Sequence, residues 1–398
     1  MLTVEENELL TRVGPGTPVG ELLRRYWMPL APKAEIDEKG KRQLRLLGED
    51  LLVFKDGGGR YGLIAEQCSH RGVSLFYGRI EADGIRCPYH GWKYDVTGRC
   101  IDQPAEPPDS NYKNSICHPA YPVEELGGVL FGYLGPAPVP LLPRYDILAR
   151  QDWLRRIELH PVLDCNWLQP MENAVDPAHL HWLHGFTGGA NTSKDERSDF
   201  EIFEYGIYKS HHDERRTEVH PLVFPNILRG PGNVGHFRIP MDDTHTGVLY
   251  VIYSPTPPSD AISRQSEVPY KYIGPIKESF DDYGLVRQRH HMKTFASQDG
   301  MAWETQGAIA NRAREHLASS DKGVVMLRQL LRIQLEKIKR GEDPMGVIRD
   351  SAKNHMIEFK VQVIDKMTGN EIPYRDYDRR SFATPISEKA RPREGGKP

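Results

Sequence analysis

The sequence has few cysteines and no long hydrophobic run. Only five cysteines occur in 398 residues, which argues against the disulfide framework that stabilises many secreted proteins. No uninterrupted apolar stretch approaches the roughly 18 residues that a membrane-spanning helix needs. The acidic opening MLTVEENELL also lacks the basic and apolar regions of a secretory signal. We therefore expect a cytoplasmic protein that does not enter membranes, whose cysteines are considered first as metal ligands.

Neither sign of charge dominates the composition. The 52 lysines and arginines nearly balance the 55 aspartates and glutamates, for a net charge of −3, so no electrostatic affinity for nucleic acid is expected. We find no internal repeat and no Gly-rich dinucleotide-binding loop. A chain of this length can form two domains, each with its own hydrophobic core.

Apolar periodicity divides the chain into four parts. Residues 1–40 predict an N-terminal helical segment, in which a Gly-Pro-Gly turn at 14–16 separates two short helices. Residues 41–145 contain short apolar runs between turns, which predicts an all-β domain. Residues 146–385 mix both periods, with a strand at 248–253 and a long amphipathic helix at 323–340. The polar, Gly/Pro-rich residues 386–398 predict a flexible tail.

Two short motifs each combine one cysteine with one histidine. Residues 68–72 read Cys-Ser-His-Arg-Gly and residues 87–92 read Cys-Pro-Tyr-His-Gly-Trp. Two thiolates and two neutral imidazoles hold a Rieske [2Fe–2S] cluster, whose potential lies at about −150 to +300 mV. A Cys2His2 zinc site has the same residue types, but zinc modules usually pair Cys with Cys and His with His. The predicted cluster ligands are Cys68, His70, Cys87 and His90. The cysteines expected to be ordinary thiols are Cys100, Cys117 and Cys165.

A second group of histidines follows an aspartate. Residues 173–184 read Asn-Ala-Val-Asp-Pro-Ala-His-Leu-His-Trp-Leu-His. His184 lies five residues beyond His179, about 140° further round an ideal α-helix. The helix must therefore bend, unwind or end for both imidazoles to reach one metal ion, and Gly185 can supply a stop. Geometry alone leaves His181 as an alternative ligand.

These motifs and the opening ENELLTRVGPGTPVGELLRRYW resemble the phthalate-dioxygenase-like branch of the Rieske non-haem iron oxygenases, and the resemblance covers nearly the whole chain. It implies an α+β protein with an N-terminal all-β Rieske domain. The implied C-terminal domain has the helix-grip fold, an antiparallel sheet wrapped around a long helix.

The resemblance implies a mononuclear Fe(II) bound by His179 and His184. The segment Gln298-Asp299-Gly-Met-Ala-Trp-Glu304 resembles the part of the family that supplies the third ligand, which favours Asp299. Two histidines and one carboxylate leave iron positions open for O2. The alternative carboxylates are Glu304, Asp281 and Asp282, and helix capping is the alternative role of Asp299.

The resemblance also implies how electrons reach the iron. An aspartate at the position of Asp176 bridges an iron-binding histidine, here His179, to a cluster histidine of the neighbouring subunit, here His90. The implied assembly is a homotrimer or a pair of stacked trimers. Its electrons come from a separate NAD(P)H-dependent flavin and iron–sulfur reductase.

The substrate is the least specified part of the prediction. The branch typically hydroxylates small aromatic carboxylates and aryl ethers, and hydroxylation of a methoxy carbon releases formaldehyde. Such substrates need cationic or hydrogen-bonding groups in a mostly apolar pocket. Candidates on expected strands, for which solvent-facing positions are an equal alternative, are His211, Arg215, His236 and Arg238. The alternative function is a Rieske-type electron carrier with a non-catalytic binding domain, but the second metal motif argues against it.

Overall fold

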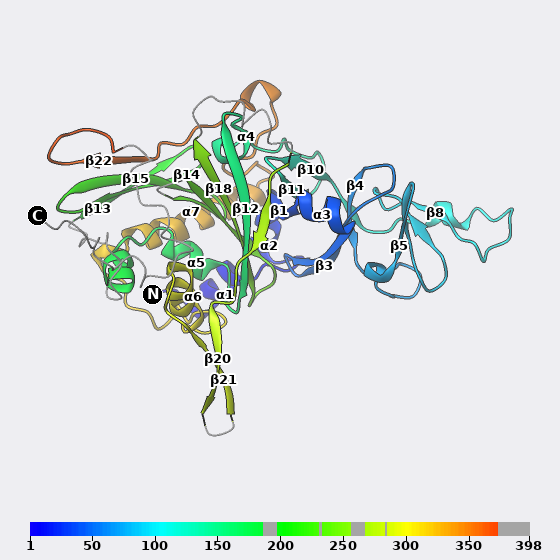
Figure 1. Cartoon of the computed structure of the whole chain (residues 1–398), viewed down its shortest axis with the longest axis horizontal. Helices are drawn as coiled ribbons and strands as arrows, with labels where there is room; N and C mark the ends of the chain where they lie inside the picture. Colours follow the sequence, from blue (N-terminus) through cyan, green and yellow to red (C-terminus); the bar gives the residue numbers. More distant parts are fainter. Residues whose placement is uncertain (186–196, 231–232, 256–266, 283–284, 373–398) are drawn as a thin grey trace, which may run out of the picture.

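The structure is a computed structural model that describes residues 1–185, 197–230, 233–255, 267–282 and 285–372. A smaller β-rich region, which carries the two Cys/His motifs, lies at one end of the long axis, and a larger region of sheet and helices forms the rest (Figure 1). The tail predicted at 386–398 lies outside the described residues.

The β-rich region contains three small sheets within the described residues. One sheet joins β1 (Trp27–Pro32), β11 (Val129–Tyr133) and β10 (Val123–Leu126). Another joins β2 (Lys41–Leu46), β3 (Glu49–Lys55), β4 (Tyr61–Ala65) and β9 (Ala120–Tyr121). The third joins β5 (Arg79–Glu81), β6 (Gly84–Arg86), β7 (Lys93–Tyr94) and β8 (Cys100–Asp102) at the end of the molecule (Figure 1). The all-β character predicted for this part is confirmed.

The larger region is built on one sheet, which has nine strands in the described chain. Its order is β13-β14-β15-β16-β17-β18-β12-β19, and β22 pairs with β15. The strands are β12 (Trp153–Leu163), β13 (Arg197–Phe203), β14 (Gly206–His212), β15 (Arg216–Val223), β16 (Ile227–Gly230), β17 (Val234–Pro240), β18 (Thr246–Pro255), β19 (Tyr270–Tyr272) and β22 (Gln362–Asp365). β18 confirms the strand predicted at 248–253. A separate hairpin of β20 (Lys277–Asp282) and β21 (Leu285–His290) projects from this region (Figure 1).

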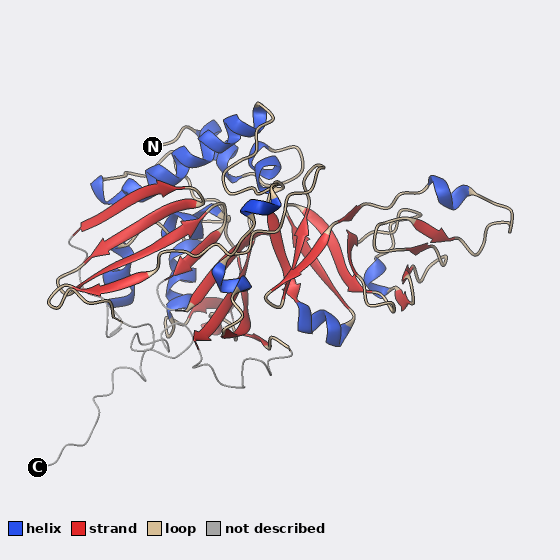
Figure 2. Cartoon of the chain, turned by 90° about the horizontal axis from the view of Figure 1, so that it is seen from above, coloured by secondary structure: helices blue, strands red, loops and turns tan. Residues whose placement is uncertain are grey.

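Most of the helices lie on one side of the large sheet and fill its curve, whereas the helix Lys33–Lys39 packs against β1, β2 and β3 (Figures 1 and 2). The helices are α1 (Val4–Thr11), α2 (Pro18–Leu23), α3 (Lys33–Lys39), α4 (Asp146–Ala149), α5 (Leu168–Asn173), α6 (Phe295–Glu304) and α7 (Lys322–Lys339). Short 3-10 turns cover Leu75–Tyr77, Tyr112–Ser115, Ser319–Asp321 and Ser351–Lys353. No helix in the described part of the chain is both long and apolar enough to cross a bilayer.

The long helix α7 packs against the sheet through its apolar stripe. Leu327 and Leu331 are fully buried, in one core with Ile207 of β14 and Leu222 of β15. Leucines four residues apart lie on the same helix face, so the stripe predicted for 323–340 is confirmed. The expected α+β architecture, with a sheet curved around a long helix, is confirmed as well.

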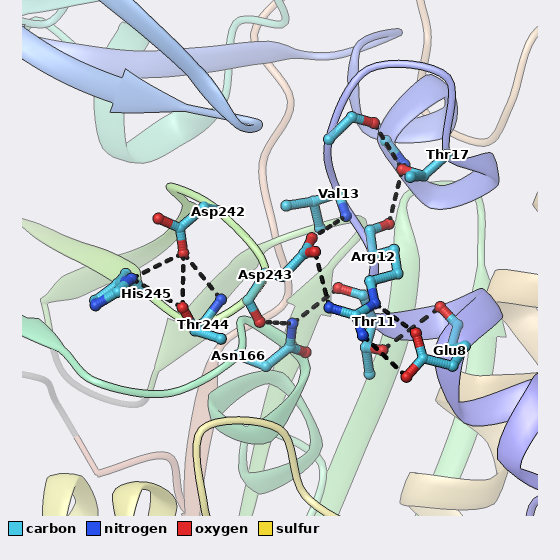
Figure 3. A network of polar contacts seen from close by, with 12 residues as sticks. Glu8, Thr11, Arg12, Val13, Thr17, Asn166, Asp242, Asp243, Thr244 and His245 are labelled. Atoms are coloured by element: carbon cyan, nitrogen blue, oxygen red, sulfur yellow. Dashed lines mark hydrogen bonds and ion pairs between the residues drawn. The ribbon is translucent and has the colours of Figure 1, made fainter.

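The N-terminal helices belong to the packing of the larger region. The carboxylate of Asp243, in the turn between β17 and β18, accepts hydrogen bonds from the Val13 N–H (2.9 Å) and the Arg12 guanidinium (3.0 Å) (Figure 3). The side-chain amide of Asn166, just before α5, donates to the carbonyls of Thr11 and Asp243, both at 2.8 Å. The N-terminal segment is therefore tied to the base of α5.

Candidate metal centres and substrate cavity

The two Cys/His motifs form loops of matching backbone geometry. In each loop the cysteine N–H donates to the carbonyl five residues on (2.9 Å for Cys68, 2.8 Å for Cys87). The glycine four residues on returns an N–H to the cysteine carbonyl (2.9 Å for Gly72, 3.2 Å for Gly91). Both glycines have a positive φ, +72° and +76°, which glycine adopts without strain. Each loop therefore presents one thiol and one imidazole from the same kind of tight turn.

The loops bring the four predicted cluster ligands together. The rings of His70 and His90 have centroids 4.5 Å apart, and Trp92 stacks on His70 at the same distance. Cys68 and Cys87 are both 3% exposed. Burial raises the pKa of the Cys87 thiol, and the neighbouring Cys68 raises it further. Two adjacent buried thiols beside two imidazoles fit a [2Fe–2S] cluster, whose irons stabilise the thiolate form.

His179 and His184 lie at the two ends of a widened helical turn. A π-helix covers Leu180–His184 and starts from His179, and a π-helix hydrogen-bonds at i+5. The two imidazoles, which an α-helix would turn about 140° apart, are brought together with ring centroids 5.4 Å apart. The π-helix ends at His184 with Gly185 as its C-cap, as expected, although Gly185 keeps right-handed helical angles (φ −73°, ψ −37°). Local unwinding of the helix, one of the three expected possibilities, brings the histidines together.

The carboxylate of Asp299 reaches both histidines from α6. Its Oδ1 lies 3.3 Å from His184 Nε2 and 3.8 Å from His179 Nε2. One ligand atom from each of the three residues lies within 4.8 Å of the others. Thr294 caps α6 and forms a capping box with Ser297. The capping role considered for Asp299 is therefore wrong.

Hydrogen bonds orient both imidazoles toward Asp299. His179 Nδ1 donates to the backbone carbonyl of Asp176 (2.5 Å), and His184 Nδ1 donates to Gln298 Oε1 (2.7 Å). Burial by itself raises the pKa of Asp299, but interaction with the two histidines holds it below its ordinary value. Its buried Oδ1 has no hydrogen-bond partner among the described atoms. An ionised, unsatisfied oxygen between two Nε2 atoms fits a divalent cation.

The alternative histidine lies outside this group of ligand atoms. His181 belongs to the same π-turn, but its ring lies 5.0 Å from that of Trp182, which is 67% exposed. Asp281 and Asp282 lie on β20 in the projecting hairpin, where their side chains fall outside the described part of the structure.

Glu304, the other alternative carboxylate, is occupied by different partners. Its Oε2 lies 2.6 Å from Lys277 Nζ and 2.9 Å from His290 Nε2, both at the base of the projecting hairpin. Its Oε1 accepts the backbone N–H of Asp164 at 3.0 Å. Glu304 thus joins α6 to the hairpin and to β12.

Charged side chains fix the backbone that carries the histidines. Glu172 of α5 accepts two hydrogen bonds from Arg312 (both 2.8 Å) and one from Arg328 (2.7 Å). The buried Lys209 of β14 donates to the carbonyl of Ala174 at 3.1 Å. Bidentate arginine–carboxylate pairs are among the strongest hydrogen-bonded pairs in proteins, so α5 is held firmly against α7.

Asp176 sits at the start of the histidine turn with a partly exposed side chain. Its carboxylate accepts the Ala178 N–H at 2.9 Å and lies 3.6 Å from His179 Nδ1, whose hydrogen goes to the Asp176 backbone carbonyl. The side chain is 28% exposed. The first cluster loop lies between β4 and β5 and the second between β6 and β7, and the sheet of β5 to β8 lies at the end of the molecule away from α5 and α6 (Figure 1).

A small cavity lies beside Asp299, between α6 and the large sheet. Ala296 and Trp303 stand three residues before and four residues after Asp299, on the same helix face. The lining residues are His160, Pro161, Leu163, Arg238, Val248, Tyr250, Ile276, Ala296 and Trp303. The cavity is therefore mostly apolar, with one guanidinium and one imidazole in its wall.

Arg238 places a buried cation in this wall. It is 2% exposed, and its guanidinium carbon lies 4.9 Å from the Trp303 ring centroid and 5.5 Å from that of Tyr250. Its hydrogen bonds go to the Tyr250 hydroxyl (3.4 Å) and to His236 Nδ1 (3.3 Å). No carboxylate in the described chain forms an ion pair with it. A buried cation without an anion is costly, so this site suits an anionic group.

The predicted substrate residues differ in burial and in their place in the fold. Arg238 and His236 lie side by side on β17 and are buried, and burial followed by the Arg238 charge lowers the pKa of His236 well below its ordinary value. His211 is also buried, but on β14, which β15 and β16 separate from β17. The solvent-facing alternative is therefore wrong for these three. Arg215 is exposed in the turn between β14 and β15, so its expected place on a strand is wrong.

Some residues of the site were missed in the sequence. Gln298 directly precedes Asp299, and Trp303 follows it by one helical turn, so both could have been found from the helix pattern. His160 and Tyr250 come from β12 and β18, and their rings lie 4.0 Å apart only because these strands pair. No local signal marks them.

Comparisons with known proteins agree with this geometry. Residues 26–122 match the Rieske [2Fe–2S] domain family, and residues 277–392 match the family described as LigXa C-terminal domain like. The chain is 39% identical over 394 residues to the 5,5'-dehydrodivanillate O-demethylase oxygenase subunit of Sphingobium sp. strain SYK-6, covering 94% of this chain and 90% of that protein. It is 32% identical over 433 residues to the phthalate 4,5-dioxygenase oxygenase subunit of Pseudomonas putida, covering 96% and 95%.

Solved structures show the same fold at lower identity. The Pseudomonas putida CBB5 NdmA QL mutant with caffeine superposes with a TM-score of 0.62 at 20% identity, covering 85% of this chain and all of that chain. The terminal oxygenase of carbazole 1,9a-dioxygenase from Novosphingobium sp. KA1 gives 0.57 at 19% identity, covering 79% and 94%.

The chain belongs to the oxygenase subunits of the Rieske non-haem iron oxygenases, in the phthalate-dioxygenase-like branch. It is an oxidoreductase with a [2Fe–2S] cluster in its Rieske domain and a mononuclear iron in its catalytic domain. A separate electron-transfer protein supplies its electrons. The class, branch and cofactors predicted from the sequence are confirmed, and the Rieske match rules out the zinc alternative.

The carboxylate geometry gives a direct test. In Asp299→Ala we expect the iron content to fall from about three to about two per two acid-labile sulfides, because two imidazoles alone hold iron(II) loosely. The visible spectrum of the cluster should not change. Iron and sulfide analysis of the purified variant measures the ratio.

Glu304→Gln is the matched control for this variant, since it alters a carboxylate on the same helix. It should keep the wild-type ratio of iron to sulfide. Loss of iron from Glu304→Gln, with retention in Asp299→Ala, would reverse the assignment of the third ligand.

Proposed function

We propose that this oxygenase O-demethylates a methoxylated aromatic acid, using O2 and electrons from a separate NAD(P)H-dependent flavin and iron–sulfur reductase in the cytoplasm. The observation that carries the proposal is the buried guanidinium of Arg238, which has no carboxylate partner in the described chain and lines the cavity beside Asp299. A carboxylate on the substrate would supply the missing anion.

The relatives support an aromatic acid as the substrate. Three of them are named for 5,5'-dehydrodivanillate, phenoxybenzoate and phthalate, and each of these names denotes an acid anion. The relative at 39% identity is an O-demethylase. Two aromatic side chains, Trp303 and Tyr250, line the cavity next to Arg238, so an aryl carboxylate would meet both an apolar wall and a cation.

We propose the following ligands for the two metal centres. The ligands of the cluster are Cys68, His70, Cys87 and His90. The ligands of the mononuclear iron are His179, His184 and Asp299. When bound, the iron activates O2 and the cluster delivers electrons to it. The reaction balances as one methyl ether, one O2, two electrons and two protons giving one phenol, one formaldehyde and one water.

The chain's own side chains would orient the substrate. Arg238 would hold the carboxylate, and the attached ring would lie beside Asp299, because Ala296 and Trp303 of the lining lie one turn to either side of it. The cavity has a volume of about 10 Å³, room for one water molecule, so its walls would move apart to admit the ring. Neutral His236 accepts a hydrogen bond from Arg238 and so fixes the orientation of the guanidinium in the cavity wall. Apolar walls exclude water from the reacting group.

Product analysis tests the proposed reaction. The purified protein should contain about three irons and two acid-labile sulfides per chain. With a reductase and NAD(P)H it should convert a methoxybenzoate to the corresponding phenol, with one formaldehyde per O2 consumed. The panel should contain methoxybenzoates, their methyl esters, and benzoates without a methoxy group. A diol without formaldehyde would identify ring dihydroxylation, and no product from any aromatic acid would refute the proposal.

Arg238→Ala tests the anionic part of the substrate. A hydrogen bond to a charged group contributes about 1.5–3 kcal/mol, so we expect KM for the acid to rise by roughly ten- to a hundredfold with the iron content unchanged. KM for the methyl ester should change little. Exposed Arg215→Ala is the matched control and should behave as wild type. An unchanged KM for the acid in Arg238→Ala would remove this residue from the site.

We propose that the active form is a homotrimer or a pair of stacked trimers, in which Asp176 connects His179 to His90 of the partner subunit. Two observations support this arrangement. The cluster loops and α5 lie at different ends of one chain (Figure 1), and the Asp176 carboxylate is partly exposed beside His179. A carboxylate that accepts N–H groups from two imidazoles would orient both and join the two centres.

Asp176→Asn keeps the volume of the side chain and removes its charge. We expect both metal centres to stay occupied, the oligomer to stay intact and the cluster to be reduced normally. Single-turnover transfer from the cluster to the mononuclear iron should fall by orders of magnitude, measured by stopped-flow absorbance of the reduced cluster. Normal transfer in a fully metallated variant would show that Asp176 does not form the bridge, and loss of stability alone would indicate a structural role.

A further inference from the structure

A buried histidine lies beneath the cluster loops without belonging to the proposed ligands. His118 is fully buried, directly before β9. Its backbone N–H donates to the carbonyl of Gly98 at 2.8 Å. Its ring contacts the end of β4, the first cluster loop and β7. One side chain therefore joins three segments that surround the cluster ligands.

The hydrogen bonds of this ring determine where its protons lie. Nε2 of His118 is 2.8 Å from the carbonyl oxygen of Ala65, which can only accept, so Nε2 carries the hydrogen. Burial lowers the pKa of His118, so the ring is neutral and Nδ1 has a free lone pair. Nδ1 lies 2.7 Å from Ser69 Oγ. The Ser69 hydroxyl, between two proposed ligands in the chain, must therefore donate to His118.

The face of the His118 ring positions a second side chain with a hydroxyl group, that of Tyr94. Tyr94 stacks on His118 with ring centroids 4.6 Å apart and an interplanar angle of 30°. The Tyr94 hydroxyl lies 3.2 Å from Cys68 Sγ. A cluster-bound thiolate has no proton, so Tyr94 is the donor to the sulfur.

We propose that His118 is a positioning residue that sets the reduction potential of the cluster through Tyr94 and Ser69. It holds the Tyr94 ring so that the Tyr94 hydroxyl donates to Cys68, and it accepts the hydrogen bond of the Ser69 hydroxyl so that this hydroxyl does not donate to a cluster sulfur. Hydrogen bonds to the sulfurs favour the reduced cluster, which carries one more negative charge. The inference rests on the cluster ligands proposed above and is independent of the substrate.

The test is the midpoint potential of the cluster in the whole oxygenase without substrate, measured by titration of its visible absorption. Tyr94→Phe should lower the ratio of reduced to oxidised cluster at a given potential by about tenfold, equivalent to about 59 mV for one electron. Ser69→Ala should leave the potential unchanged, because its proton is directed to His118. A shift in Ser69→Ala as large as in Tyr94→Phe would overturn the proposal.

His118→Leu is measured in the Ser69→Ala background. Without His118, the Ser69 hydroxyl could donate to a cluster sulfur and mask a fall in the potential, and Ser69→Ala removes this hydroxyl. It should lower the potential toward the value of Tyr94→Phe, and adding Tyr94→Phe should produce little further change. His118→Gln, which keeps a donor and an acceptor, should restore most of the potential. A wild-type potential in His118→Leu, or full additivity with Tyr94→Phe, would show that His118 has only a structural role.

Two further outcomes keep the test decisive. If His118→Leu does not retain the cluster, the proposal is still overturned by a shift in Ser69→Ala, by an unchanged potential in Tyr94→Phe, or by a potential in His118→Gln as low as that of Tyr94→Phe. If the wild-type protein itself lacks a Rieske spectrum, the ligand assignment fails, and that failure is distinct from an error about His118.

Discussion

The catalytic region depends on keeping one buried carboxylate between two imidazoles that come from a distant part of the chain. An ionised oxygen without a donor is costly inside a protein, so the groups around Asp299 have to be held until a cation compensates it. The π-turn aligns the two histidines, and Gln298 and the Asp176 carbonyl fix their Nδ1 atoms. Glu172 and Lys209 hold the backbone behind them. The helices on the sheet thus position the three side chains that we propose as iron ligands.

The inner face of the large sheet also carries a buried positive charge, that of Arg238. Arg238 lies among aromatic rings and beside His236, whose pKa is lowered mainly by burial. Neutral imidazoles can accept from a guanidinium without cancelling its charge, so the positive charge remains available to an anionic substrate. The cation and the unsatisfied Asp299 oxygen are close enough that Arg238 lowers the pKa of Asp299. The two residues that we propose for substrate and iron binding therefore influence each other electrostatically.

The two centres use hydrogen bonding in similar ways at opposite ends of the molecule. Gln298 accepts a hydrogen bond from His184, and Tyr94 is hydrogen-bonded to Cys68 and stacks on His118. In both places a buried neutral group fixes the donor or acceptor that touches a proposed ligand. The separation of the two regions within one chain is the reason why we propose that electron transfer uses a neighbouring subunit (Figure 1).

Residue type and short spacing were enough to predict what is local: the two Cys/His loops, the histidine helix, the all-β and α+β regions and the long helix α7. Chemistry of this kind depends on neighbours within a few residues, which the sequence states directly. The spacing of His179 and His184 predicted that the helix must bend, unwind or end between them, but not that it would widen into a π-turn, because that form depends on where Asp299 lies in the fold. The resemblance favoured Asp299 over Glu304, but only the tertiary structure showed their different partners, since both lie on α6 and these partners come from different strands and helices. The tertiary structure alone placed Arg238 in a cavity and left Arg215 in solvent, because burial depends on which strands pair and what packs on them.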